Sequence, residues 1–241
     1  MGKMDNMFNS KYSKLLTAVL IIVIIAVITL LAFLGYDVYK KYSIESESEE
    51  AVSQFENEIN KNNTNTVDNT TENIEENAID PNIDLNSIIG NTTNNNTNNN
   101  NGGNKVTYKG YEVIGTIEIP KTNIKYPIIK DEDVGPKSLN VAICNLYGNL
   151  NELGGNAFLV GHNYRNGTFF SNNKKLSKGD KVYITDNSGK KVTYVIYKKY
   201  ETGTGDFDYA TRKVDANKRE ISLSTCTDDT KKRLIIWAVA E

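Results

Sequence analysis

Residues 221–237, ISLSTCTDDTKKRLIIW, consist of two apolar runs joined by a polar segment. In the first run Ile221 and Leu223 alternate with serines, a period of two that is typical of a strand with one buried face. Cys226 ends this run, and Arg233 opens the second. If the two runs are antiparallel neighbours joined by TDDTKK, the thiol and the guanidinium face one groove a few ångströms apart.

The same alternation recurs through residues 105–241, in YEVIGTIEI, IKYPII, NAFLVGH, KVYIT, VTYVIYKKY, EISLST and RLIIWAV. These runs are rich in Val, Ile, Tyr and Thr, and turn residues such as GGN, NG, KGD and NSGK separate them. The pattern predicts an all-β barrel or sandwich of about eight strands. Helical periodicity is weak, and only residues 135–146 and 168–176 are predicted as short helices.

The N-terminal region contains a predicted membrane anchor. Leu15 to Leu34 are twenty consecutive residues without a charge, which at ~1.5 Å per residue span about 30 Å, the hydrocarbon thickness of a bilayer. A cleaved signal peptide is the rival interpretation, but the run exceeds the usual length of about 7–15 residues and no small-x-small cleavage site follows it. We therefore expect a cytoplasmic N-terminus over residues 1–14 and a transmembrane helix over residues 15–36.

Residues 37–104 are predicted to be a disordered tether. From residue 45 to Gly90 this segment has twelve acidic residues against one lysine, and an asparagine-rich tract follows. Such a composition buries too little apolar surface to offset the entropy lost on ordering. Residues 105–241, by contrast, carry 22 basic against 16 acidic residues, the single Trp and His and both cysteines, and form the expected catalytic domain.

Three side chains of this domain form a candidate catalytic set. Cys226 at a strand end is the candidate nucleophile, and Arg233 is placed to stabilise a thiolate or an oxyanion. His162 follows the apolar run NAFLV and is the chain's only imidazole, so it is the candidate proton donor and acceptor.

The spacing alone does not decide between a catalytic and a purely structural role for the cysteine and the histidine. A lone cysteine is often a small buried hydrophobe, and a lone histidine is often a satisfied core or surface residue. Cys144, flanked by Val141, Ala142 and Ile143, fits the buried role. An even cysteine count also permits a Cys144–Cys226 disulfide, which would remove the nucleophile.

Several other classes of function find no support in the sequence. It contains no internal repeat, no Gly-rich phosphate loop and no His/Cys cluster at metal-ligand spacing. One histidine makes a zinc site improbable. We expect no nucleic acid partner and no bound metal.

Three segments of residues 105–241 resemble signatures of sortases, the cysteine transpeptidases of bacteria with thick peptidoglycan walls. These are IGTIEIPKTNIKYPII, GNAFLVGHNYRNGTFFSNNKKLSKGDKVYI and LSTCTDDTKKRLIIWA. In that family the pattern Leu-x-Thr-Cys carries the nucleophile, which matches Cys226, and an arginine several residues later matches Arg233. The family's Gly-His-Asn histidine matches His162.

The resemblance implies an eight-stranded sortase-type β barrel with short helices. It implies cleavage of an LPxTG-like sorting signal on exported proteins, a thioester on Cys226, and transfer of the acyl group to an amine of a wall precursor or a pilin. Thr225 is then a candidate for substrate binding, and residues 201–219 correspond to the loop that lines the groove. Some sortases bind calcium through acidic residues near the groove; this sequence identifies no such ligands, and no cofactor is expected.

The resemblance also implies a location and a subclass. Sortases act outside the membrane, so the anchor at residues 15–36 would contact lipid with the catalytic domain extracellular. Because the last strand runs directly to Glu241, we expect a single-anchor enzyme that attaches surface proteins to the wall. The alternatives are a pilus-polymerising sortase, a cysteine hydrolase and a non-catalytic surface binding module.

Overall fold

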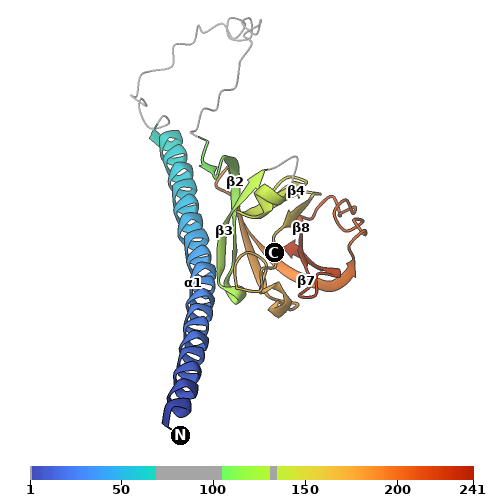
Figure 1. Ribbon diagram of the computed structural model, residues 1–241. Helices are drawn as coiled ribbons and strands as arrows, with labels where there is room; N and C mark the ends of the chain where they lie inside the picture. Colours follow the sequence, from blue (N-terminus) through green and yellow to red (C-terminus); the bar gives the residue numbers. More distant parts are fainter. Residues whose placement is uncertain (1, 69–104, 131–134) are drawn as a thin grey trace, which may run out of the picture. The chain divides into compact units, whose positions relative to one another are not determined.

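A computed structural model describes residues 2–68, 105–130 and 135–241 of the chain. Two compact units are present, residues 1–47 and 48–241. The second contains nine strands: β1 (Thr107–Tyr108), β2 (Tyr111–Ile119), β3 (Ile124–Lys130), β4 (Ile143–Tyr147), β5 (Asn156–Val160), β6 (Lys181–Asp186), β7 (Lys191–Gly203), β8 (Glu220–Cys226) and β9 (Lys232–Ala240). Figure 1 shows these strands wrapped around a common axis.

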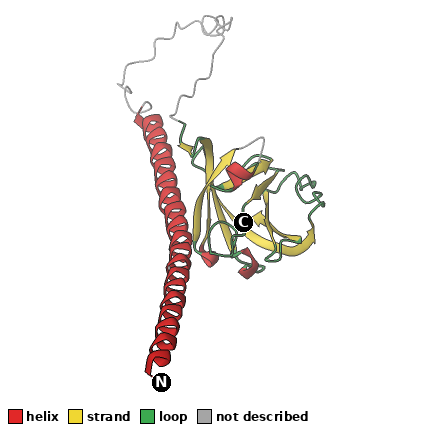
Figure 2. Cartoon of the chain, in the orientation of Figure 1, coloured by secondary structure: helices red, strands yellow, loops and turns green. Residues whose placement is uncertain are grey.

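The strands form a closed barrel. Their order is β1-β2-β3-β4-β5-β8-β9-β7-β6, and pairing of β2 with β6 joins the two ends. Because β1 has only two residues and pairs antiparallel with β2 outside the closing β2–β6 contact, the closed wall has the eight strands β2 to β9. Most neighbours are antiparallel, but β3–β4 and β5–β8 are parallel. The predicted eight-stranded barrel is confirmed, and Figure 2 shows its strands in yellow, joined mainly by loops in green.

The interior of the barrel is filled by the apolar residues that the alternation placed on one face. Ile117, Ile184, Leu223 and Ile236 are all fully buried. Burying each such side chain contributes roughly 1.5–3 kcal/mol. In β8 and β9, residues that face the barrel interior alternate with residues that face outward. The outward-facing residues therefore form a second face, separate from the core, that can carry functional side chains.

The two predicted short helices are largely replaced by other structure. Within residues 135–146, only Pro136–Leu139 form a helix (α3), and Ile143–Tyr147 is strand β4. The reason is tertiary pairing, since β4 has a parallel partner in β3 and an antiparallel partner in β5. Within residues 168–176, only Asn173–Lys175 form a single 3-10 turn, η2. A second 3-10 turn, η1 (Pro120–Thr122), joins β2 to β3.

The N-terminal helix α1 (Gly2–Asp68) contains the predicted membrane segment. Within it, Tyr12–Lys61 is long and apolar enough to cross a membrane, with an 18-residue window of mean hydropathy 3.2 that is not buried by the rest of the protein. Leu15, Leu20, Ile25 and Leu34 each expose about half or more of their surface. Exposed apolar side chains over this length fit a lipid environment.

The helix differs from the predicted tether over residues 37–68, and residues 69–104 lie outside the described residues. Ala51, Val52 and Phe55 are at most 4% exposed, and Ile59 packs beside them. These positions recur every three to four residues, which builds one apolar helix face. The prediction of a disordered tether was based on the acidic composition of the whole segment and did not take this spacing into account.

The apolar face of residues 51–59 packs on the barrel within the second unit. Its partners are Tyr108, Val113, Ile129, Ala142 and Cys144. Polar contacts flank the patch, with Ser48 and Tyr108 hydroxyls 3.3 Å apart and Lys125 Nζ 2.7 Å from a Glu56 carboxylate oxygen. This helical segment is therefore part of the same folded unit as the barrel.

We predict that Phe55→Ala lowers the free energy of unfolding of the full chain by about 3 kcal/mol, because it removes a buried ring and leaves a cavity. Urea unfolding in detergent micelles, followed by the fluorescence of the single tryptophan, Trp237, measures this effect. Ser53→Ala, on the exposed face of the same turn, is the matched control. Equal stability of the two variants would contradict the packing of this segment.

Candidate active site

Cys226 and Arg233 are paired across two neighbouring strands. In the antiparallel ladder of β8 and β9, the last residue of β8, Cys226, lies opposite Arg233. Arg233 Nη1 donates a hydrogen bond to Cys226 Sγ over 2.7 Å. A guanidinium only donates, so the sulfur is the acceptor, and the pair confirms the antiparallel arrangement expected of residues 221–237.

His162 reaches the same end of the barrel from β5. In the parallel ladder of β5 and β8, Val160 lies opposite Ser224, and Gly161 N donates to Ser224 O over 3.2 Å. Continuing this register by two residues brings His162 level with Cys226. A parallel pair aligns strand ends of the same polarity, so residues far apart in sequence meet here.

The environment of His162 lowers the pKa of its imidazole below the ordinary value of 6.5. Burial is the main cause, and the positive charge of Arg233 is the second. The ring lies 4.9 Å from that of Tyr164, which covers one side. Because the charge of Arg233 affects this pKa, His162 interacts electrostatically with the same guanidinium that contacts Cys226 Sγ.

Neither cysteine is engaged in a disulfide. Cys144 lies in β4 with no exposed surface, and Cys226 is partly exposed. The Cys144–Cys226 bridge that the cysteine count permitted is therefore ruled out in this structure. Cys144 occupies the buried role expected for it, and Cys226 keeps a free thiol at the strand end.

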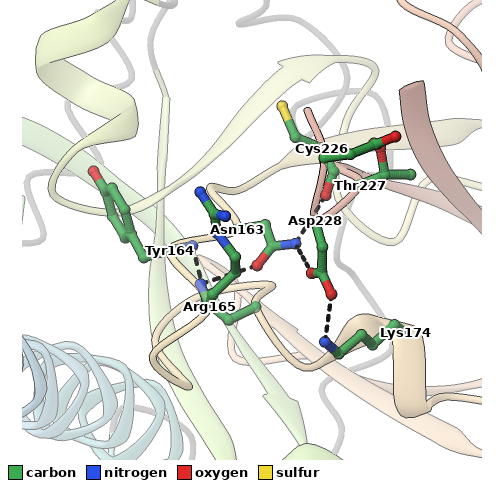
Figure 3. Close-up of polar contacts among 9 residues, drawn as sticks. Asn163, Tyr164, Arg165, Lys174, Cys226, Thr227 and Asp228 are labelled. Atoms are coloured by element: carbon green, nitrogen blue, oxygen red, sulfur yellow. Dashed lines mark hydrogen bonds and ion pairs between the residues drawn. The ribbon is translucent and has the colours of Figure 1, made fainter. Parts of the chain in front are cut away.

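Sequence reasoning missed a polar clamp behind the cysteine. The Asn163 side-chain amide donates to Cys226 O over 3.0 Å and to Asp228 Oδ1 over 2.9 Å. Lys174 Nζ donates to the other oxygen of Asp228 over 2.6 Å. Figure 3 shows the Asn163 amide between the main-chain oxygen of Cys226 and the Asp228 carboxylate. These contacts join the segments that carry His162 and Cys226.

The clamp also affects Asp228 itself. Hydrogen bonds from Lys174 and then Asn163 hold the pKa of this carboxyl below its ordinary value. Asp228 is therefore a carboxylate at neutral pH. The only signal for the clamp in the sequence was the Gly-His-Asn context, which does not specify the partner of the asparagine.

Comparison with known proteins identifies the family. A family model described as the Sortase domain matches residues 117–241, just over half of the chain. The chain belongs to the sortase family. Sortase A of Bacillus anthracis is 32% identical over 130 residues, which are 52% of this chain and 58% of that protein. The chain thus aligns with less than two thirds of that relative's length.

Solved structures of sortases are similar to the catalytic unit. Sortase A from Corynebacterium diphtheriae is 27% identical, with a TM-score of 0.48, and the match covers 54% of this chain and 61% of that one. Sortase C-1 from Actinomyces oris is 23% identical, with a TM-score of 0.47, covering 54% and 73% of the two chains.

Thr225 of this sortase lies on the opposite face of β8 from the sulfur. It is 2% exposed, and its hydroxyl has no hydrogen-bond partner within the described residues. The side chain lines a cavity of about 460 Å³ together with Phe170 and Leu234. Cys226 borders this cavity, whereas His162 and Arg233 do not. The predicted role of Thr225 in substrate binding stays a prediction.

The outward face of the sheet beside the Cys226–Arg233 pair is largely buried, and part of it is apolar. Ser222, Ser224 and Cys226 share this face, and their partners in β9 are Trp237, Ile235 and Arg233. Beside them lies a cluster formed by Phe158, Tyr209, Ala210 and Ile235, with Val160, Tyr200 and Trp237 packed against it. Two members come from the 201–219 loop, for which no single residue was assigned from the sequence.

The described residues contain no group of three or more His, Cys, Asp or Glu side chains that could hold a metal ion.

We predict that the His162 imidazole titrates below pH 6.5 in the full-length sortase and that Arg233→Gln raises this midpoint. The substitution removes the repulsion between two cations and leaves burial in place. Because His162 is the only histidine, its imidazole NMR signals report the titration without assignment. Arg165→Gln, in the exposed loop after His162, is the control and leaves the midpoint unchanged. If Arg233→Gln left the titration midpoint of His162 unchanged, the result would contradict an electrostatic interaction between the two side chains.

Proposed function

We propose that this sortase is a cysteine transpeptidase that cleaves an LPxTG-like sorting signal on exported proteins and transfers the acyl group to an amine. The observation that carries the proposal is the 2.7 Å contact between Arg233 Nη1 and Cys226 Sγ, at the strand end that His162 also reaches. Nucleophile, cation and proton carrier are the three groups that acyl transfer through a thioester requires.

In the first step, Cys226 Sγ attacks the carbonyl carbon of the scissile amide. The thiol proton passes to His162, and Arg233 donates to the oxyanion that forms. Collapse of this intermediate breaks the C–N bond, and the leaving amine takes the proton from His162. The lowered pKa of His162 makes the imidazolium a ready proton donor at neutral pH.

In the second step, an incoming amine attacks the thioester carbonyl. His162 accepts the amine proton, Arg233 again stabilises the oxyanion, and the C–S bond breaks to leave the new amide. The proton returns to the sulfur, so the enzyme is regenerated. The thioester conserves the bond energy of the original amide, and no nucleotide is consumed.

The membrane anchor supports an envelope location for this reaction. We place residues 1–14 in the cytoplasm, residues 15–36 in the bilayer and the catalytic unit outside the cell. Exported proteins emerge at the membrane, where a tethered enzyme meets them at high effective concentration. The amine donor is a wall precursor, which makes the product a surface protein attached to the cell wall.

We predict that Cys226→Ala abolishes turnover of an LPxTG-type peptide with triglycine as acceptor. Arg233→Lys keeps the charge but loses the planar fork, and we expect it to lower kcat about 10²–10³-fold. His162→Ala falls in a similar range. Product formation is followed by mass spectrometry, with retained near-UV circular dichroism as evidence of folding. Lys232→Ala, the exposed neighbour of Arg233, is the control with unchanged turnover.

We further predict that the acyl group reaches an amine and not only water. With the peptide alone, intact-protein mass spectrometry detects an acyl adduct on Cys226. Adding triglycine discharges the adduct and yields a new peptide. Discharge at the same rate with and without triglycine would indicate a hydrolase, and the absence of any adduct would favour a binding module. Replacing triglycine by a pilin-derived lysine peptide tests the pilus alternative.

A further inference from the structure

The loop between β7 and β8 crosses the whole outward face of the active-site sheet. It leaves β7 at Gly203, which lies opposite Lys232 next to the Cys226–Arg233 pair. It enters β8 at Glu220, the other end of that strand. Seven strand residues correspond to about 20 Å, so residues 204–219 run along the face on which the reaction takes place.

The middle of this loop packs onto the sheet. Tyr209 is 2% exposed, and its ring meets that of Phe158 edge-on at 5.3 Å. Ala210 is buried beside it, against Ile235. Phe207, just before these residues, exposes 55% of its surface at a ring distance of 6.3 Å from Tyr209. The loop therefore completes the buried apolar cluster with Tyr209 and Ala210, and it presents one exposed ring, Phe207, beside that cluster.

A buried arginine fastens the loop after this apolar contact. Arg212 Nη2 lies 2.6 Å from Glu220 Oε2, and the two side chains are 13% and 10% exposed. The same nitrogen donates to Asn156 Oδ1 over 3.2 Å. The guanidinium lies 4.3 Å from the centre of the Trp237 ring. One side chain from the loop thus contacts three strands, β5, β8 and β9.

Strand residues also hold the main chain of the loop. Asn156 Nδ2 donates to Ala210 O over 2.9 Å, and Ser222 Oγ lies within 3.2 Å of Tyr209 O. Tyr197 Oη donates to Glu220 Oε2 over 2.5 Å, which satisfies the carboxylate further. Removing Arg212 leaves Glu220 as a buried charge without its cation, an arrangement that favours detachment of the loop.

We propose that Arg212, through Glu220 and Asn156, is a positioning residue that holds residues 204–213 packed on the buried apolar cluster of the sheet and thereby sets the affinity for the sorting peptide. The inference rests on the proposed function. Arg212 contacts none of the three reacting groups in the described structure, so its effect on a bound peptide passes through the loop. Peptide binding depends on the position of the loop, whereas bond cleavage at Cys226 does not.

Steady-state kinetics of the full chain in detergent micelles separate these effects. For Arg212→Gln we expect KM for an LPxTG-type peptide to rise about tenfold or more while kcat at saturation changes less than about threefold. KM for triglycine stays unchanged. Arg212→Lys keeps the cation and retains part of the affinity that Arg212→Gln loses, whereas Lys178→Gln, at an exposed lysine outside the loop, behaves as the unsubstituted enzyme. A loss confined to kcat, or an unchanged KM, would overturn the proposal.

A second variant and a second readout keep the test independent of activity. The double variant Arg212→Gln/Glu220→Gln removes both charges. It therefore folds without a buried unpaired carboxylate, but it still lacks the ion pair that holds the loop on the sheet. Hydrogen exchange measured by mass spectrometry is then faster over residues 204–213 in this double variant, and unchanged in β8 and β9. Unchanged exchange in the loop would overturn the proposal. If the unsubstituted chain does not turn over the peptide, the proposed function fails, and the exchange data alone decide the role of Arg212.

Discussion

The parallel pairing of β5 with β8 is the constraint on which the active site depends. Antiparallel hairpins bring together residues close in sequence, and the Cys226–Arg233 pair across β8 and β9 is of that kind. An antiparallel pairing cannot bring His162 next to Cys226, because both residues lie at the carboxyl end of a strand. Only a parallel ladder places two such ends side by side, and β5–β8 supplies it. The side-chain amide of Asn163 then donates a hydrogen bond to the Cys226 carbonyl oxygen, which holds the ends of the two strands together.

The two faces of the active-site sheet have separate tasks. Leu223, Ile236 and Ala238 face the interior and are fully buried, so they hold the barrel together. The residues between them carry the Cys226–Arg233 pair and contribute Ile235 to the buried apolar cluster beside it. A period of two thus lets a single strand contribute to stability and chemistry at once. This division explains why Thr225, one residue from Cys226, lies on the opposite side from the sulfur.

The alternation of apolar residues was enough to predict the strands and the Cys226–Arg233 pair, because both depend on local pattern. The choice of a barrel over a sandwich came from the family resemblance. The position of His162 rested on family resemblance, since a parallel pairing leaves no mark on local spacing. The helix face at Ala51, Val52 and Phe55 was missed for another reason: few apolar residues stand in an acidic background there, and only their spacing reveals the face. Strand β4 was missed because its partners, not its own residues, decide its conformation.

The two cysteines differ in a way that matters for reagents aimed at this protein. Cys144 has no surface in contact with solvent, and Cys226 is partly open and hydrogen-bonded by a guanidinium. An electrophile added to the folded chain therefore meets one accessible sulfur, not two. A covalent ligand built into the pocket that Cys226 borders gains its selectivity from Phe170, Tyr200 and Leu234, which also line it, and the buried thiol gives it no competing target.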